Sequence, residues 1–205
     1  MDNAGEHNRD LNQIPCAENS SGVLKQIERE FETLGSHFMV ILNTKSTRNF
    51  DAVAHSLNLN LGAGKKCVYV SVGLPYDYIL KEIKKRDIKI ENIFFIDCVS
   101  AMAGLDLMPC ENLAFVETPA ELEKINRNID YHLKRMEEGK KFIVMDSFST
   151  LLIYNTIDSI KEFTCFLINK MRSEKISGIF VVIDKEIPED FACHLSENCD
   201  RVIHI

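Results

Sequence analysis

The stretch KFIVMDS, residues 141–147, holds an unbroken apolar run from Phe142 to Met145 and then an acidic residue, Asp146. A second run of this kind, IFVV, spans residues 179–182. Uninterrupted apolar strands are typical of the centre of a parallel sheet, because both faces of such a strand are buried. These two runs therefore predict a parallel sheet that is covered by helices on both faces.

Strand-like and helix-like segments alternate on either side of these runs. Apolar, β-branched runs predict strands at 37–43, 66–73, 92–100, 112–117, 141–147, 178–184 and 200–205. Apolar residues at helical spacing predict helices at 23–35, 48–62, 76–87, 118–139, 156–174 and 188–198. This alternation implies right-handed βαβ units. We therefore predict an α/β fold, a three-layer sandwich with a mainly parallel sheet.

The length and composition predict one domain with a short tail. The chain has 205 residues, of which 45% are hydrophobic, enough to bury a core. Residues 1–22 are polar and predict a flexible N-terminal tail, which leaves residues 23–205 for the domain. The tail lacks the apolar core of a signal peptide, and no apolar run approaches the roughly 20 residues that span a bilayer. We therefore expect no membrane association.

The seven cysteines predict a cytoplasmic protein. Their number is odd, none forms a C-x-x-C pair, and most lie inside apolar runs such as KCVYVSV. This distribution indicates buried, reduced thiols rather than a disulfide framework. Cys193, His194, Cys199 and His204 match no zinc-binding pattern, so we expect no metal site there.

The net charge of −7 argues against nucleic acid or an anionic membrane as a partner. A local exception is the basic run at residues 81–89, which contains Lys81, Lys84, Lys85, Arg86 and Lys89. A solvated helix face explains this run, and an anionic partner is the alternative.

One predicted helix carries a strong start signal. In TPAE, residues 118–121, Thr118 has the chemistry of an N-cap and Pro119 suits the first helical position. Glu121 would complete a capping box by accepting from the Thr118 N–H group. We therefore expect this helix to begin at Pro119, with Thr118 as its N-cap.

The ends of parallel strands are where ligands bind in such sheets. Here the predicted strands end at or near Asn43, Gly73, Asp97, Glu117, Asp146 and Asp184. The first is followed by a loop and then a helix, which is the context of a phosphate loop, G-x-x-x-x-G-K-[ST].

This first loop, NTKSTRNF at residues 43–50, does not supply the residues of a phosphate loop. With Asn43 at the first Gly position, Arg48 replaces the second Gly, Asn49 the Lys and Phe50 the hydroxyl residue. Taking Lys45-Ser46 as the Lys-Ser pair leaves too short a loop to wrap a phosphate. A polar turn in which Thr47 or Asn49 caps the next helix also fits these residues.

Two further strand ends bear on nucleotide chemistry. Asp146 follows an apolar strand, as the Mg²⁺-ordering Asp of a Walker B motif does, although capping of a nearby helix or loop N–H group is an alternative role. Ser147, Ser149 and Thr150 then suit loop hydrogen bonds. Residues 72–74 supply no carboxylate to orient an attacking water.

Several of these segments together resemble the RecA-like core of archaeal KaiC-like proteins, which belong to the P-loop ATPases. The segments are KKCVYVSVGLPYDYILKEIKKRDIKIENIFFIDCVS (65–100), NLAFVETPAELEKI (112–125), KFIVMDSFSTLLIYNTIDSIKEFTCFLINKMRSEKISGIFVVIDKEI (141–187) and CDRVIHI (199–205). The resemblance covers about residues 34–205 and looks closest to a branch of small, single-domain members. It implies a RecA-like fold.

The resemblance also assigns positions. Asp146 matches the Walker B Asp, and the loop from Asn43 to Phe50 stands where the Walker A loop would be. Val72 and Gly73 stand near the strand end where active KaiC-like proteins hold paired catalytic glutamates. Two parts of the ATPase machinery therefore depart from the family pattern.

These departures predict a non-catalytic RecA-like module, that is, a pseudo-ATPase that binds no cofactor. We expect it to act through a protein partner or self-association, in regulation or signalling. The alternative is an ATP-binding protein with little or no hydrolysis. In that alternative Asn43, Lys45, Ser46, Thr47 and Asp146 hold the nucleotide, and Asp146 holds Mg²⁺. Nucleic-acid binding through residues 81–89 is a third hypothesis, which the net charge fits poorly.

Overall fold

The strands of the computed structural model, which describes residues 20–45, 49–105, 110–137 and 140–205, form one parallel sheet. The seven strands of this described part are β1 Met39–Thr44, β2 Lys66–Ser71, β3 Ile93–Asp97, β4 Leu113–Phe115, β5 Lys141–Asp146, β6 Ser177–Ile183 and β7 Arg201–His204. Their order is β4-β3-β2-β5-β6-β1-β7, and each neighbouring pair is parallel. The predicted parallel sheet is confirmed.

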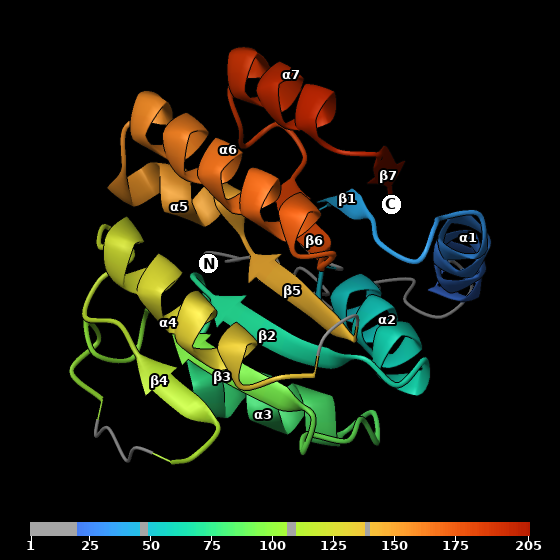
Figure 1. Ribbon diagram of the computed structural model, residues 1–205, viewed down its shortest axis with the longest axis horizontal. Helices are drawn as coiled ribbons and strands as arrows, with labels where there is room; N and C mark the ends of the chain where they lie inside the picture. The colour runs from blue at the N-terminus through green and yellow to red at the C-terminus, as the bar shows by residue number, and fades with distance from the viewer. Residues whose placement is uncertain (1–19, 46–48, 106–109, 138–139) are drawn as a thin grey trace, which may run out of the picture.

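Helices cover both faces of this sheet (Figure 1). They are α1 Ser20–Glu32, α2 Asn49–Gly62, α3 Tyr76–Lys84, α4 Leu122–Lys134, α5 Phe148–Tyr154, α6 Ile157–Ser173 and α7 Glu189–Asn198. In Figure 1, α2 and α3 lie on one side of the sheet, and α4, α5 and α6 lie on the other. The predicted three-layer α/β sandwich is therefore confirmed.

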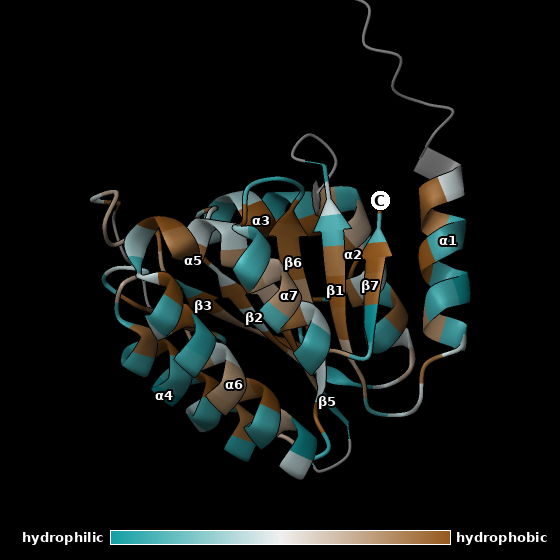
Figure 2. Ribbon diagram, turned by 90° about the horizontal axis from the view of Figure 1, so that it is seen from above, coloured by the Kyte–Doolittle hydropathy of each residue, from teal (hydrophilic) through white to brown (hydrophobic). Residues whose placement is uncertain are grey.

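Two apolar cores fill the spaces between the layers, because successive strand residues point to opposite faces. Val68 and Val70 of β2 belong to the core under α4–α7. Cys67 and Tyr69, their neighbours in the same strand, belong to the core under α2 and α3. Figure 2 shows the strands as the most hydrophobic part of the ribbon, as expected for a sheet buried on both faces.

Helix α1 stands beside the edge strand β7 (Figure 2). Gln26 Nε2 donates to the His204 carbonyl at 3.1 Å, and Arg201 Nη1 lies 2.7 Å from Glu30 Oε2. These contacts cover a sheet edge that would otherwise offer unpaired backbone groups. The helix begins at Ser20, earlier than the expected Val23, and the rest of the predicted tail lies outside the described residues.

The predicted start of the helix at 118–139 is wrong. Helix α4 begins at Leu122, and its N-cap residue is Glu121, which makes no capping hydrogen bond with its side chain. Lys124 Nζ instead lies 3.0 Å from Glu121 Oε1. Thr118 Oγ1 accepts from Ala120 N at 3.3 Å, so Thr118 shapes the preceding turn.

The cysteines of the described residues are all unpaired, but they are not uniformly buried. Cys67 and Cys98 are buried, as expected, whereas Cys110 and Cys193 are exposed. Burial raises the pKa of the Cys98 thiol well above its usual value, which makes that thiol unreactive. Over the described residues, no helix is long and apolar enough to cross a membrane.

Candidate functional site

The end of β1 sends its last two side chains to opposite faces of the sheet. Thr44 is buried, and its Oγ1 donates to the Val182 carbonyl at 3.4 Å. Asn43 lies on the α7 side, where its Nδ2 is 3.2 Å from His204 Nδ1. Asp146, by contrast, follows Phe142 and Val144, which face α2 and α3. The structure therefore does not bring Asn43 and Asp146 together on one face.

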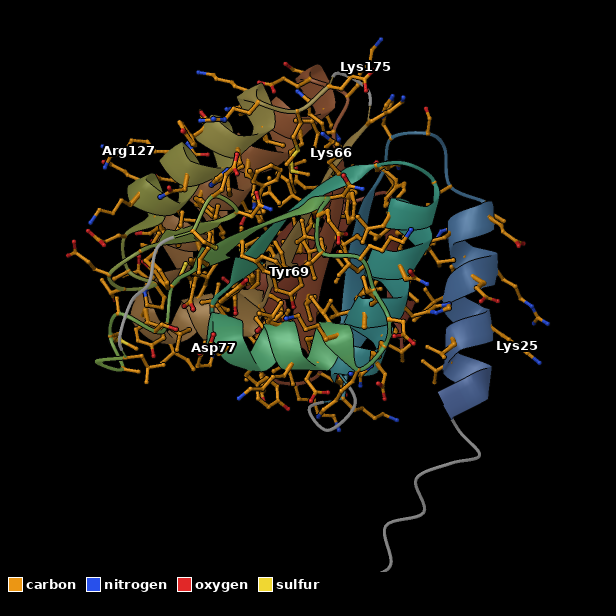
Figure 3. All side chains as sticks on the ribbon, turned by 90° about the horizontal axis from the view of Figure 1, so that it is seen from below. Lys25, Lys66, Tyr69, Asp77, Arg127 and Lys175 are labelled. Carbon is orange, nitrogen blue, oxygen red and sulfur yellow. The ribbon has the colours of Figure 1, made fainter. Side chains whose placement is uncertain are left out.

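Asp146 ends β5 with a side chain that is 7% exposed. Tyr69 Oη, from the neighbouring strand β2, donates to Asp146 Oδ2 at 2.6 Å. Burial and the charge of Asp146 both raise the pKa of Tyr69 well above its usual value, so the phenol keeps its proton. Tyr69 is completely buried, and it lies near the middle of the view in Figure 3.

Tyr69 is the residue at this site that sequence reasoning missed. It lies in the apolar run KCVYVSV, where a tyrosine is an ordinary strand residue. A signal for its role exists only once β2 and β5 are known to be neighbours, with Ser71 opposite Asp146. That pairing places the phenol within reach of the carboxylate.

The residue after Asp146 caps the next helix. Ser147 is the N-cap of α5, and its Oγ accepts from Thr150 N at 3.3 Å. Ser149 Oγ accepts from Ile183 N at 2.8 Å, which ties α5 to the end of β6. A separate helix at Phe148–Tyr154 was not predicted, because seven residues show too little of the helical repeat.

The loop after β1 is described at its two ends only. Lys45 is exposed, Ser46 and Thr47 lie outside the described residues, and α2 begins at Asn49. Phe50, the next residue, is half-buried, and the Arg86 guanidinium lies 5.1 Å from its ring centroid. The same Arg86 pairs with Asp51 and Glu82, so Phe50 is part of a helix–helix contact between α2 and α3.

The segment after β2 supplies no carboxylate. Val72 is buried in the core under α4–α7, and a Cβ on Gly73 would lie 3.2 Å from Thr150 Oγ1. Ser71 Oγ donates to the Leu74 carbonyl, which closes the turn. Asp97, at the end of β3, is also committed to local structure, since it accepts from Tyr76 N, Val99 N and both donors of Ser100.

The basic run at residues 81–89 is partly paired with acidic side chains. Lys85 pairs with Glu82, and Arg86 pairs with Glu82 and Asp51. Among the described residues, no three His, Cys, Asp or Glu side chains converge in a way that could hold a metal ion.

Solved structures share this architecture. A KaiC-like protein from the archaeon Pyrococcus horikoshii has a TM-score of 0.58 and 15% identity, with 82% of this chain and 70% of that chain covered. An uncharacterised protein from the same organism, solved with an unknown peptide, has a TM-score of 0.62 and 13% identity, with 88% of this chain and 82% of that chain covered.

A third similar structure is the flagellar accessory protein FlaH from Methanocaldococcus jannaschii, with a TM-score of 0.54 and 17% identity, covering 82% of this chain and 70% of that one. No protein-family model and no curated protein sequence matches the chain. At these identities the likeness establishes the fold alone. The chain therefore has the RecA-like fold of archaeal KaiC-like proteins, as the resemblance implied.

Proposed function

We propose that this RecA-like chain is a pseudo-ATPase, a non-catalytic module that acts through contacts with other proteins. The observation that carries the proposal is the pair of residues Asn49 and Phe50, with which the described part of α2 begins after β1. With Asn43 at the first Gly position, Asn49 and Phe50 take the places where a phosphate loop has its Lys and its Ser or Thr.

These residues do not fit a magnesium nucleotide. An asparagine amide at position 49 has no charge to neutralise the β and γ phosphates, and the ring of Phe50 has no oxygen for Mg²⁺. The ring also packs against the Arg86 guanidinium, which holds Phe50 in a structural contact. The site therefore lacks the two side chains on which phosphate and metal binding depend.

The carboxylates available at the strand ends also argue against hydrolysis of ATP. Asp146 keeps the Walker B position, but one of its oxygens accepts a hydrogen bond from Tyr69. Val72 and Gly73 offer no carboxylate to orient an attacking water. Positioning of water and stabilisation of charge both depend on such groups, so we expect no turnover of ATP.

A second candidate function, ATP binding through an unorthodox loop, rests on one observation. A carboxylate, Asp146, still ends β5, and an exposed ammonium, Lys45, still follows β1. In this alternative Lys45, Ser46 and Thr47 hold the phosphates and Asp146 orders Mg²⁺, while Asn43, which faces α7, does not take part.

Calorimetric titration of the full chain with ATP and Mg²⁺ separates the two functions. The pseudo-ATPase proposal expects a Kd weaker than about 100 µM, which corresponds to roughly −5.5 kcal/mol. Tighter binding that is lost in both Asp146→Ala and Lys45→Ala, but kept in Lys84→Ala, would contradict the pseudo-ATPase proposal. Lys84 is exposed on α3 and serves as the matched lysine control.

Exposed apolar side chains support the protein-contact part of the proposal. Ile153 at the end of α5 is 76% exposed, and Phe166 on α6 is 54% exposed. Such side chains are typical anchors of interfaces. Sedimentation equilibrium tests self-association, and Phe166→Ser should weaken any oligomer in which Phe166 is buried. A cytoplasmic location and a regulatory or signalling role are part of the same proposal.

A further inference from the structure

Helix α7 leaves a hollow against the sheet. It has a volume of about 260 Å³ and lies between α7 and strands β1, β6 and β7. Most of its lining is apolar: Ile41, Val182, Ile187, Ala192, Leu195 and Val202. This apolar hollow is on the face of the sheet opposite to the one that Tyr69 packs on, so it is separate from the Walker B position.

A second, polar hollow adjoins the first at the carboxyl ends of the strands. Its volume is about 180 Å³, and its lining residues are Asn43, Lys45, Asp184, His204 and Ile205. Asn43 and His204 line both hollows, so the two hollows are neighbours. A ligand seated here would have an apolar part under α7 and a polar part at the strand ends. Ligand sites of α/β sheets occur at these strand ends.

The polar hollow carries two opposite charges, the Lys45 ammonium and the Asp184 carboxylate. Among the residues that the structure describes, neither the Lys45 ammonium nor the Asp184 carboxylate forms an ion pair.

We propose that the two hollows bind a free α-amino acid with a branched or aromatic apolar side chain. The ligand's carboxylate pairs with Lys45, its ammonium group pairs with Asp184, and its side chain lies among Ile41, Val182 and Leu195. A simple carboxylic acid would meet the Asp184 carboxylate, and a simple amine would meet the Lys45 ammonium. A zwitterion satisfies both charges, and a small ligand fits hollows below the size of those that hold drug-sized molecules.

Calorimetric titration of the full chain with L-leucine and L-phenylalanine tests the proposal. We expect a Kd below about 1 mM for at least one of them. Lys45→Met and Asp184→Asn should each weaken binding about tenfold or more, because each leaves a ligand charge unpaired. Lys84→Met and Asp77→Asn, which change exposed residues on α3, should leave the affinity unchanged.

Two further ligands and one variant sharpen the result. Glycine lacks the side chain and 4-methylpentanoate lacks the ammonium group, so both should bind much more weakly than leucine. Ala192→Phe fills the apolar hollow and should abolish binding, with thermal melting as the check that the variant folds. Lys45 and Asp184 are both exposed, so their variants keep the test valid if Ala192→Phe does not fold.

Three outcomes would overturn the proposal. The first is that neither amino acid binds at about 10 mM. The second is that 4-methylpentanoate and leucine bind equally well. The third is that leucine binding is unchanged in both Lys45→Met and Asp184→Asn. The titration with ATP and Mg²⁺ is separate, so the amino-acid site and the pseudo-ATPase function can fail independently.

Discussion

Tyr69 Oη lies 2.6 Å from Asp146 Oδ2, and this hydrogen bond joins the adjacent strands β2 and β5 near their carboxyl ends. The phenol is completely buried and the carboxylate nearly so. A hydrogen bond to a buried charge is stronger than one between neutral groups. The carboxylate at the Walker B position is therefore part of the internal structure of the protein.

The first prediction concerns this bond. Tyr69→Phe keeps the ring in the core but removes the donor to Asp146, and it should lower the free energy of unfolding by about 1.5–3 kcal/mol, the range for hydrogen bonds to charged groups. Urea denaturation followed by circular dichroism measures the change. Tyr78→Phe is the control, since Tyr78 is 49% exposed on α3. A loss for Tyr69→Phe no larger than that for the control would show that the bond contributes nothing.

A second prediction follows from His132. This residue of α4 is 4% exposed, neither ring nitrogen has a hydrogen-bond partner in the described part of the chain, and the ring lies 5.1 Å from that of Phe94. Burial, and then the nearby charge of Arg135, lower the pKa of His132. Protonation therefore costs more in the folded protein than in the unfolded chain.

The sign of the pH dependence follows from this shift. The unfolded chain takes up the proton near its usual pKa of about 6.5, before the folded protein does. Stability should therefore be full above about pH 6.5 and fall as the pH drops through that value. His132→Leu should show a smaller loss between about pH 7.5 and 5.5 in urea denaturation. An equal loss in the variant and the parent protein would assign the pH dependence to other groups.

A third prediction compares two glycines. A Cβ on Gly178 in β6 would lie 2.8 Å from Met171 Cε, 2.9 Å from Met39 Sδ and 2.9 Å from Phe180 Cζ. Gly178→Ala should therefore overpack the core and destabilise the protein by about 1–3 kcal/mol. Gly62 ends α2, and a Cβ added there would meet no atom of the described residues within 4 Å. Gly62→Ala should instead stabilise by up to about 1 kcal/mol. Thermal melting of the two variants measures these effects, and stability changes of the same sign would contradict the prediction.

A fourth prediction concerns the link between α5 and β6. Ser149 is buried, and its Oγ accepts from Ile183 N at 2.8 Å. Ser149→Ala leaves that N–H group without its acceptor and should cost about 1–3 kcal/mol. The exchange of the Ile183 amide proton, followed by NMR, should speed up in the variant. Thr156→Ala, which removes the N-cap of α6, serves as the comparison, because it should cost about 1 kcal/mol without changing that amide.

Much of the fold was predictable, because burial leaves a periodic pattern along the chain. Phe142 to Met145 are all completely buried in β5, as their unbroken apolar run indicated. The stripe of Ile125, Ile129 and Leu133 likewise faces the core from α4. Capping was predicted less well at Thr118, because a capping signature describes local chemistry, while the path of the chain between β4 and α4 decides where the helix begins.

The candidate site was predicted only in part. Asp146 was placed at a strand end from its position after an apolar run, and the structure puts it there. Its partner Tyr69 could not be found in this way, because the two residues are 77 positions apart and meet only when β2 pairs with β5. Asn43 was grouped with Asp146, but the alternation of β1 turns it toward α7 and His204.

By itself, the amino-acid sequence determined the α/β class, the succession of strands and helices, and the absence of a complete phosphate-loop motif between Asn43 and Phe50. These depend on residue types and on local periodicity, which the chain carries whether or not it is folded. The tertiary structure alone decided that Tyr69 holds Asp146 and that Asn43, Lys45, Asp184 and His204 line one hollow. Such groupings depend on strand order and register, which bring together side chains from distant parts of the chain.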